Sequence, residues 1–157
     1  MKIKLLAIGK TDSKDLHPVI EEYSKRLSFY VSFNFEIIPD IKNAKNLSKK
    51  QQKIAEGKEL LKRIEKSDTI VILDEKGKTF SSVEFSVFLQ KKMNSGLKNL
   101  IFIIGGPYGF SEEIYQRANK KISLSTMTFS HQMVRLFFIE QLYRGFTILR
   151  NEPYHHS

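Results

Sequence analysis

The chain has 157 residues, a length typical of one domain, and carries 26 basic against 17 acidic residues, a formal net charge of +9. It has no cysteine, which excludes disulfide bonds and thiolate metal sites. The apolar runs are too short for a membrane helix or a signal peptide, so we expect a soluble, cytoplasmic protein. The excess of positive charge favours a polyanionic partner. An alternative is that this excess serves only to keep the protein soluble.

Strand and helix patterns alternate through the first part of the chain. Residues 2–8 form a continuous apolar run that predicts a buried strand. Apolar residues at helical spacing predict a helix over 16–27, and alternating apolar residues predict a strand over 33–38. Ser48, with a glutamine three positions later, has the capping-box pattern that starts a helix, expected over 49–66.

The same alternation continues after residue 66. The apolar run 69–73 predicts a strand covered on both faces, and the polar segment 74–78 predicts a turn. Ser81, with a glutamate three positions later, starts a helix that Gly96 ends. Residues 100–104 predict the next buried strand.

The last third of the chain completes the pattern. A glycine-rich loop over 105–110 leads into a short helix capped by Ser111. Residues 121–124 predict a fifth strand, and a long helix follows over 134–149. Alternating strands and helices predict an α/β fold, in which helices flank one open, mostly parallel sheet formed by a single domain over 1–157.

Apolar residues surround nearly the whole of the helix expected over 134–149. A helix that is apolar on every side is buried in a core or against a second chain. Because a chain of this length offers little core to surround such a helix, we expect a subunit interface and therefore a homodimer.

Three loops follow strands and should meet at one edge of the sheet, after Leu73, Ile104 and Leu124. The glycines of the second loop match neither a dinucleotide fingerprint nor a P-loop, and a tight turn into a helix stays an alternative. Glu112 and Glu113 follow this loop and would repel a phosphate group. A ligand with a cationic or neutral head, such as S-adenosylmethionine, fits better.

Other chemistries have little support. The sequence contains no H-E-x-x-H or carboxylate-rich metal spacing and no nucleophile elbow. Without further information, the terminal residues Tyr154, His155 and His156 would equally fit an unordered tail.

Several motifs, in one order and over essentially the whole length, resemble the SPOUT-class methyltransferases that methylate N3 of a pseudouridine in 23S ribosomal RNA. The motifs are Lys2-Ile3 with Ala7-Ile8-Gly9-Lys10, Leu73-Asp74 with Gly77-Lys78, Ile104-Gly105-Gly106-Pro107 with Gly109, Leu124-Ser125 with Thr128-Phe129, His131-Gln132 with Arg135, Glu140-Gln141 with Tyr143-Arg144, and Tyr154-His155-His156. The pair Pro107-Tyr108 stands where related chains vary.

The resemblance implies a SPOUT fold with a C-terminal trefoil knot, a homodimer, no metal, and S-adenosylmethionine bound in the knot. The residues implied to hold this cofactor are Leu73, Gly105, Leu124, Ser125, Thr126, Met127, Thr128 and Phe129. The RNA, free or within the ribosome, would approach across the dimer, and we expect Arg135, Tyr154 and His156 to contact it.

Methyl transfer to N3 requires a group that stabilises the developing anion and a group that accepts the proton. We assign Arg144 to the first role and His155 to the second. Two alternatives stay open, because Arg144 could instead pair with Glu140, and His155 could bind a phosphate or stack on a base.

Other functions compatible with the sequence are a SPOUT ribose 2′-O-methyltransferase and a non-catalytic RNA-binding protein of ribosome assembly. A nucleotide-binding α/β domain is disfavoured by the carboxylates at positions 112 and 113.

Overall fold

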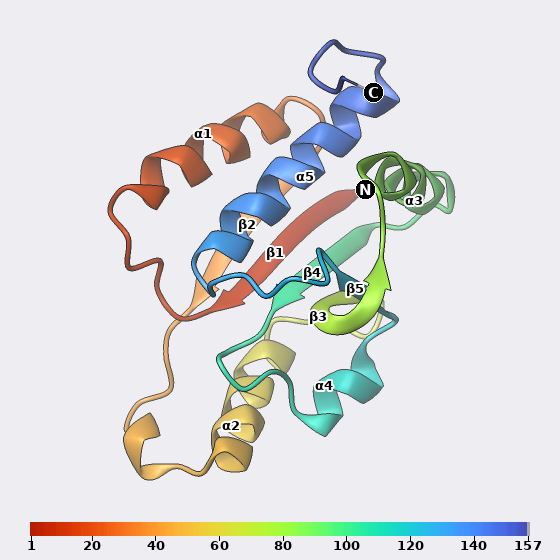
Figure 1. Ribbon diagram of the computed structural model, residues 1–157. Helices are drawn as coiled ribbons and strands as arrows, with labels where there is room; N and C mark the ends of the chain where they lie inside the picture. The colour runs from red at the N-terminus through yellow and green to blue at the C-terminus, as the bar shows by residue number, and fades with distance from the viewer. Residues whose placement is uncertain (157) are drawn as a thin grey trace.

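The computed structural model describes residues 1–156 (Figure 1). Its elements, in chain order, are β1 (Lys2–Ile8), α1 (Leu16–Ser28), β2 (Ser32–Ile38), a short 3-10 helix (Ala44–Asn46), α2 (Lys49–Leu61), β3 (Thr69–Thr79), α3 (Ser82–Asn94), β4 (Asn99–Ile104), α4 (Glu112–Arg117), β5 (Lys120–Ser123) and α5 (Met133–Leu149). Across residues 1–156, no helix combines the length and the apolar character needed to cross a membrane.

The strands form one open sheet in the order β2-β1-β4-β3-β5, and every pairing is parallel. Helices α1, α3 and α5 cover one face of the sheet, while α2 and α4 cover the other (Figure 1). The predicted α/β fold is therefore confirmed. The trefoil knot implied by the resemblance stays a prediction.

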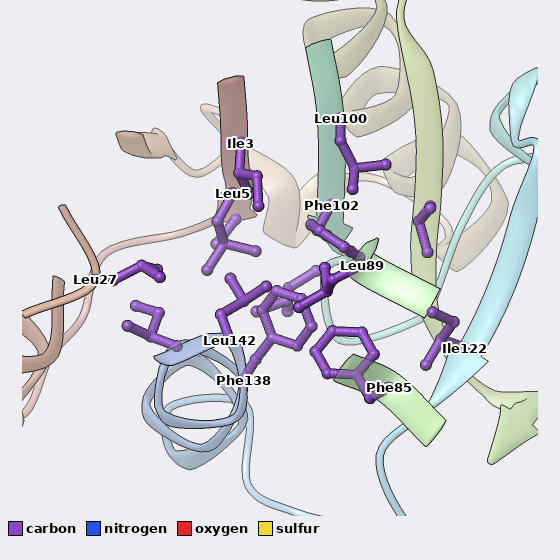
Figure 2. Packing of buried hydrophobic residues seen from close by; sticks show 14 of the residues in the cluster. Ile3, Leu5, Leu27, Phe85, Leu89, Leu100, Phe102, Ile122, Phe138 and Leu142 are labelled. Carbon is purple, nitrogen blue, oxygen red and sulfur yellow. The ribbon is translucent and has the colours of Figure 1, made fainter. Parts of the chain in front are cut away.

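Helix α5 lies between α1 and α3 on the sheet, which accounts for most of its apolar surface (Figure 1). Phe138 and Leu142 point from α5 into the core, toward Phe102 of β4 and Phe85 of α3 (Figure 2). The rings of Phe102 and Phe138 have centroids 4.8 Å apart. A subunit interface is thus not needed to explain an all-round apolar helix, and the homodimer stays a prediction.

The segment 74–78, expected to be a turn, lies within strand β3. Leu73 and Lys78 both pair with Ile122 of β5, so the four residues between them bulge out of the sheet. The backbone N–H of Lys76 donates to Oδ1 of Asp74 at 2.8 Å and closes the bulge. A Cβ on Gly77 would lie 2.5 Å from the Ile122 carbonyl carbon, so the strand can return to β5 only with glycine there.

Helix α2 begins at the predicted capping box but ends at Leu61 instead of near residue 66. Ile54 is 41% exposed, and the buried residues of α2 are Glu56, Gly57 and Leu60. A Cβ on Gly57 would lie 2.4 Å from Oγ of Ser111, so the close packing of α2 at this position requires glycine. This contact places α2 directly behind the loop that follows β4.

We predict that Phe138→Ala lowers the free energy of unfolding by about 3–5 kcal/mol, because it removes a fully buried ring and leaves a cavity. Urea unfolding followed by circular dichroism measures the change. The matched control is Phe29→Ala, which removes a ring that is 73% exposed and should change stability by less than about 0.5 kcal/mol. Equal losses in the two variants would contradict this description of the core.

Candidate functional site

The bulge within β3 and the loops after β4 and β5 surround a cavity of about 760 Å³ at the carboxyl edge of the sheet. This volume lies in the range that small-molecule ligands occupy, roughly 300–1,000 Å³. The structure brings most of the expected cofactor residues to this one cavity, namely Leu73, Gly105, Leu124, Ser125, Met127, Thr128 and Phe129. Thr126 does not line it.

Several lining residues were not predicted from the sequence. The β3 bulge contributes Asp74, Glu75 and Lys76, and α2 contributes Lys53. The bulge residues could have been found from their position directly after a predicted strand. Lys53 could not, because only the tertiary packing of α2 brings it to the cavity.

Serine side chains form hydrogen bonds with the backbone of the loop that follows β5. Oγ of Ser123 donates to the carbonyl of Ser125 at 2.8 Å, and Oγ of Ser125 accepts from the N–H of Met127 at 2.9 Å. Oγ of Ser130 accepts from the N–H of Met133 at 3.1 Å where α5 begins. The small hydroxyl residues therefore shape this wall of the cavity.

The glycines after β4 are required by what lies behind the loop. A Cβ on Gly105 would lie 3.0 Å from the ring of Phe110, and a Cβ on Gly106 would lie 2.3 Å from Oε2 of Glu56. The N–H of Gly109 donates to the carbonyl of Gly106 at 3.1 Å, and Gly109 has a φ of +80°. Close packing and the tight turn that the sequence left open as an alternative therefore explain these glycines.

Glu56 is a buried carboxyl group behind this turn. Its side chain is 3% exposed, Oε1 accepts from Gln52 at 2.9 Å, and Oε2 has no hydrogen-bond partner among residues 1–156. Burial raises the pKa of Glu56, the hydrogen bond from Gln52 opposes this effect, and the charge of Asp40 adds to it.

Arg135, expected to contact RNA, is instead fully buried. Its guanidinium donates to Oγ1 of Thr11 at 2.9 Å and to the carbonyl of Ile8 at 2.8 Å. Burial lowers the pKa of Arg135, against the attraction of Asp12 and Asp40. A side chain without exposed surface cannot reach RNA in this conformation, so the expectation is corrected: Arg135 joins α5 to the end of β1.

Arg144 and His155, the two residues expected to be catalytic, belong to a polar cluster outside the cavity. Arg144 donates to Oε1 of Glu140 from Nε at 3.0 Å and from Nη2 at 2.7 Å, which is the alternative pairing left open above. Nη1 of Arg144 lies 3.3 Å from Nδ1 of His155, and its guanidinium carbon lies 4.7 Å from the ring centre of Tyr154. Burial opposes the charge of Arg144, but the hydrogen bonds and charge of Glu140 outweigh it and raise its pKa.

The C-terminal segment is tied to this cluster and to α1. The hydroxyl of Tyr154 donates to Oε1 of Glu140 at 3.0 Å and lies 3.1 Å from the hydroxyl of Tyr23. Burial, followed by these hydrogen bonds, raises the pKa of Tyr154. Tyr30 donates to Glu152, and His156 remains exposed. The described part of the tail is therefore docked.

The cavity and the cluster lie at different ends of α5. Val134 lines the cavity, whereas Arg144 is ten residues further along the same helix, or about 15 Å along its axis. None of Arg144, Tyr154 and His155 lines the cavity. Within one chain, the residues expected to be catalytic therefore lie away from the loops expected to bind the cofactor.

A family model described as a predicted SPOUT methyltransferase matches residues 1–155. The chain belongs to the SPOUT methyltransferase family. It is 70% identical, over the full length of both chains, to a Flavobacterium johnsoniae protein named ribosomal RNA large subunit methyltransferase H. A protein of the same name from Parabacteroides distasonis is 59% identical over 157 residues, again covering both chains fully.

The fold of this SPOUT methyltransferase is also similar to the solved structure of a probable methylase family protein from Haemophilus influenzae Rd KW20. The TM-score is 0.52 at 10% identity, and the match covers 99% of this chain and 70% of that one. At so low an identity the likeness concerns the fold alone.

The cavity of this SPOUT methyltransferase fits S-adenosylmethionine. Apolar side chains such as Leu73, Leu124 and Phe129 can cover an adenine, and the loop backbones can bond to its edge. The carboxylates of Asp74 and Glu75 can attract the sulfonium, although Lys53 and Lys76 also line the cavity and balance their charge. Among residues 1–156, no group of three or more potential ligand side chains is arranged to hold a metal ion.

We predict that Glu56→Gln raises the melting temperature at pH 8 and that this gain shrinks toward pH 4. The folded state holds Glu56 at a raised pKa, so ionisation of this buried carboxyl destabilises the protein as the pH rises through that pKa. Thermal unfolding across this pH range measures the effect. Glu21→Gln, at an exposed position, is the control and should show no such trend. A Glu56→Gln variant that is less stable by the same amount at both pH values would contradict the prediction.

Proposed function

We propose that the chain is an S-adenosylmethionine-dependent methyltransferase of the large ribosomal subunit, acting on N3 of a pseudouridine in 23S ribosomal RNA. The observation that carries the proposal is the cavity built by the β3 bulge and the loops after β4 and β5, in a chain of the SPOUT methyltransferase family. The relatives named as large-subunit ribosomal RNA methyltransferases, at up to 70% identity, support the substrate class. A ribosomal substrate also accounts for the net charge of +9 and implies a cytoplasmic location.

In this proposal the cofactor loops hold S-adenosylmethionine, which supplies an electrophilic methyl group on its sulfonium. Leu73, Leu124 and Phe129 would cover the adenine, and the backbone from Gly105 to Gly109 and from Leu124 to Phe129 would provide hydrogen-bonding groups. Asp74 and Glu75 are the lining groups that would attract the sulfonium. The whole chain acts as one methyltransferase domain.

Arg144 is proposed to stabilise the acceptor base as its imide nitrogen loses a proton. The imide N3 lies between two carbonyl groups, and negative charge collects on their oxygens when N3 is deprotonated. A guanidinium that remains charged and offers several N–H donors suits those oxygens. Glu140 keeps Arg144 charged and oriented, and the exposed part of the side chain is available to the base.

His155 is proposed to accept the proton from N3. Because a guanidinium only donates, Nδ1 of His155 must be the acceptor in its contact with Arg144, so a neutral ring carries its proton on Nε2. His155 can then act as a base only when this contact opens and frees Nδ1. The same movement would free Arg144 to meet the base, so one contact links the two roles. Tyr154 and His156 are proposed to contact the RNA beside them.

A second copy of the chain is proposed to complete each active site. Methyl transfer needs the donor and the acceptor atoms about 3–3.5 Å apart, whereas the cavity and Arg144 are separated by about 15 Å of α5. A homodimer that places the cluster of one chain at the cavity of its partner removes this mismatch. Phe129 and Phe137, which are 38% and 37% exposed with ring centroids 5.0 Å apart, offer apolar surface for such a contact.

The function is tested in two steps. Calorimetry should detect binding of S-adenosylmethionine but not of NAD or ATP. Ribosomes incubated with protein and cofactor should then yield N3-methylpseudouridine in digested 23S RNA, measured by nucleoside mass spectrometry. A 2′-O-methylated nucleoside would instead identify a ribose methyltransferase, and absence of cofactor binding would favour a non-catalytic RNA-binding protein.

We predict that two inactive variants restore activity when mixed. Arg144→Ala should keep cofactor binding and lose turnover. Gly105→Val should lose cofactor binding, because its added atoms collide with the ring of Phe110. Mixed dimers would contain one site with an intact cavity and an intact arginine, so an equal mixture should reach about a quarter of wild-type activity. Each variant alone is the control.

The mixing experiment requires that the dimers exchange subunits, which refolding the two variants together ensures. If the mixture remains as inactive as its components, the cavity and Arg144 act within one chain, and the two-chain site is wrong.

A further inference from the structure

Tyr108 stands apart from the other tyrosines of the chain. Of the six tyrosines in the sequence, it is the one with neither a hydrogen bond nor an aromatic neighbour among residues 1–156. Its side chain is 44% exposed, and it belongs to neither core cluster. The fold therefore gives no reason for an aromatic residue at this position.

The turn that carries Tyr108 is held in a fixed shape. Pro107 restricts the backbone before it, the N–H of Gly109 bonds to the carbonyl of Gly106, and Gly109 adopts a positive φ. The turn lies against the packed side chains of Glu56 and Phe110. An aromatic ring on a rigid turn can bind a planar partner with little loss of conformational freedom.

The ring lies at the mouth of the cofactor cavity, beside a group of lysines. Tyr108 and Lys53 both line the cavity, and Nζ of Lys49 lies 5.3 Å from the ring centre of Tyr108. Lys49 and Lys53 are four residues apart on α2 and so share one side of that helix. Neither lysine forms an ion pair within residues 1–156.

These lysines are not explained by the stability of α2. They occupy the first five residues of the helix, where the dipole disfavours cations, and no acidic residue accompanies them in the first turn. A solvated helix face is a sufficient explanation for Lys58, which is exposed further along α2. Lys49 and Lys53 instead concentrate positive charge beside an exposed ring.

We infer that Tyr108, Lys49 and Lys53 form a platform for single-stranded RNA next to the methylated nucleotide. An unpaired base stacks on Tyr108, and the lysines contact the phosphates on either side of it. Exposed aromatic rings beside cations are the combination that binds single-stranded nucleic acid. The inference rests on the proposed function, because it places the RNA at the mouth of the methyl-donor cavity.

The platform is tested by fluorescence anisotropy with a labelled single-stranded oligoribonucleotide of about 12 nucleotides, a length within the site sizes of single-strand-binding proteins. Tyr108→Ala should weaken binding roughly tenfold, whereas Tyr108→Phe, which keeps the stacking face, should bind like wild type. Lys49→Ala should reduce the slope of log Kd against log salt by about 0.7. Lys58→Ala removes the same charge from an exposed position on α2 and should leave the slope unchanged.

Calorimetry with S-adenosylmethionine separates the platform from the cofactor site. Tyr108→Ala removes a ring that lines the cavity but keeps the backbone of the turn, so it should weaken RNA binding more than cofactor binding. If it weakens cofactor binding and leaves RNA binding intact, Tyr108 is a wall of the cofactor site and the platform is wrong. Unchanged RNA affinity in both Tyr108→Ala and Lys49→Ala would also overturn it, even where wild-type protein methylates ribosomes and the proposed function holds.

Discussion

The joint between the end of β1 and the start of α5 is the contact on which the arrangement of the cavity depends. Arg135 is buried there without an ion-pair partner within residues 1–156, held by the Ile8 carbonyl and the Thr11 hydroxyl. His131 bonds to the same carbonyl at 3.2 Å, and Gln132 bonds to the backbone of Lys10 and Asp12. Because α5 is fixed at this point, the loop after β5 must cross the carboxyl edge of the sheet. The loop that crosses there forms one wall of the cavity.

Burying a guanidinium is costly unless its donors are used, and one donor of Arg135, Nε, has no partner among residues 1–156. Glu56 has an unpaired oxygen on the other side of the glycine loop, and both groups feel the charge of Asp40. The carboxyl edge of this sheet thus contains buried groups of both signs that are not fully bonded. Fold stability alone would favour apolar residues at such positions, so their presence beside the cavity agrees with a functional edge.

Local patterns allowed most of the fold to be predicted. Ser48 and Ser81 both form the capping boxes that their spacing indicated, and the continuous apolar strands lie in the middle of a parallel sheet. The loops that would surround a ligand also followed from strand ends. The predictions that failed concerned residues whose positions depend on contacts between distant parts of the chain. Arg135 is an ordinary surface cation by its spacing on the helix, and only its contact with β1 reveals that it is buried.

Two further features could not be read from one stretch of sequence. The bulge in β3 exists because Gly77 meets the backbone of Ile122, a neighbour from another strand. The pairing of Lys49 with Tyr108 joins a helix to a loop nearly sixty positions away. The apolar pattern of α5 was read correctly as burial, but the pattern cannot say whether the covering surface belongs to the same chain. In this structure α1 and α3 provide most of it.

Because the C-terminal segment docks among several tyrosines, tyrosine fluorescence can report whether the segment is bound. The chain has no tryptophan, so its near-ultraviolet emission comes from tyrosine. Four of the six tyrosines, Tyr23, Tyr30, Tyr143 and Tyr154, lie together where the tail meets α1 and α5. The hydroxyls of Tyr23, Tyr30 and Tyr154 bond to each other or to Glu140 and Glu152, contacts that alter tyrosine emission. Release of the tail can therefore be followed in the unlabelled protein, at the place where Arg144 and His155 are held.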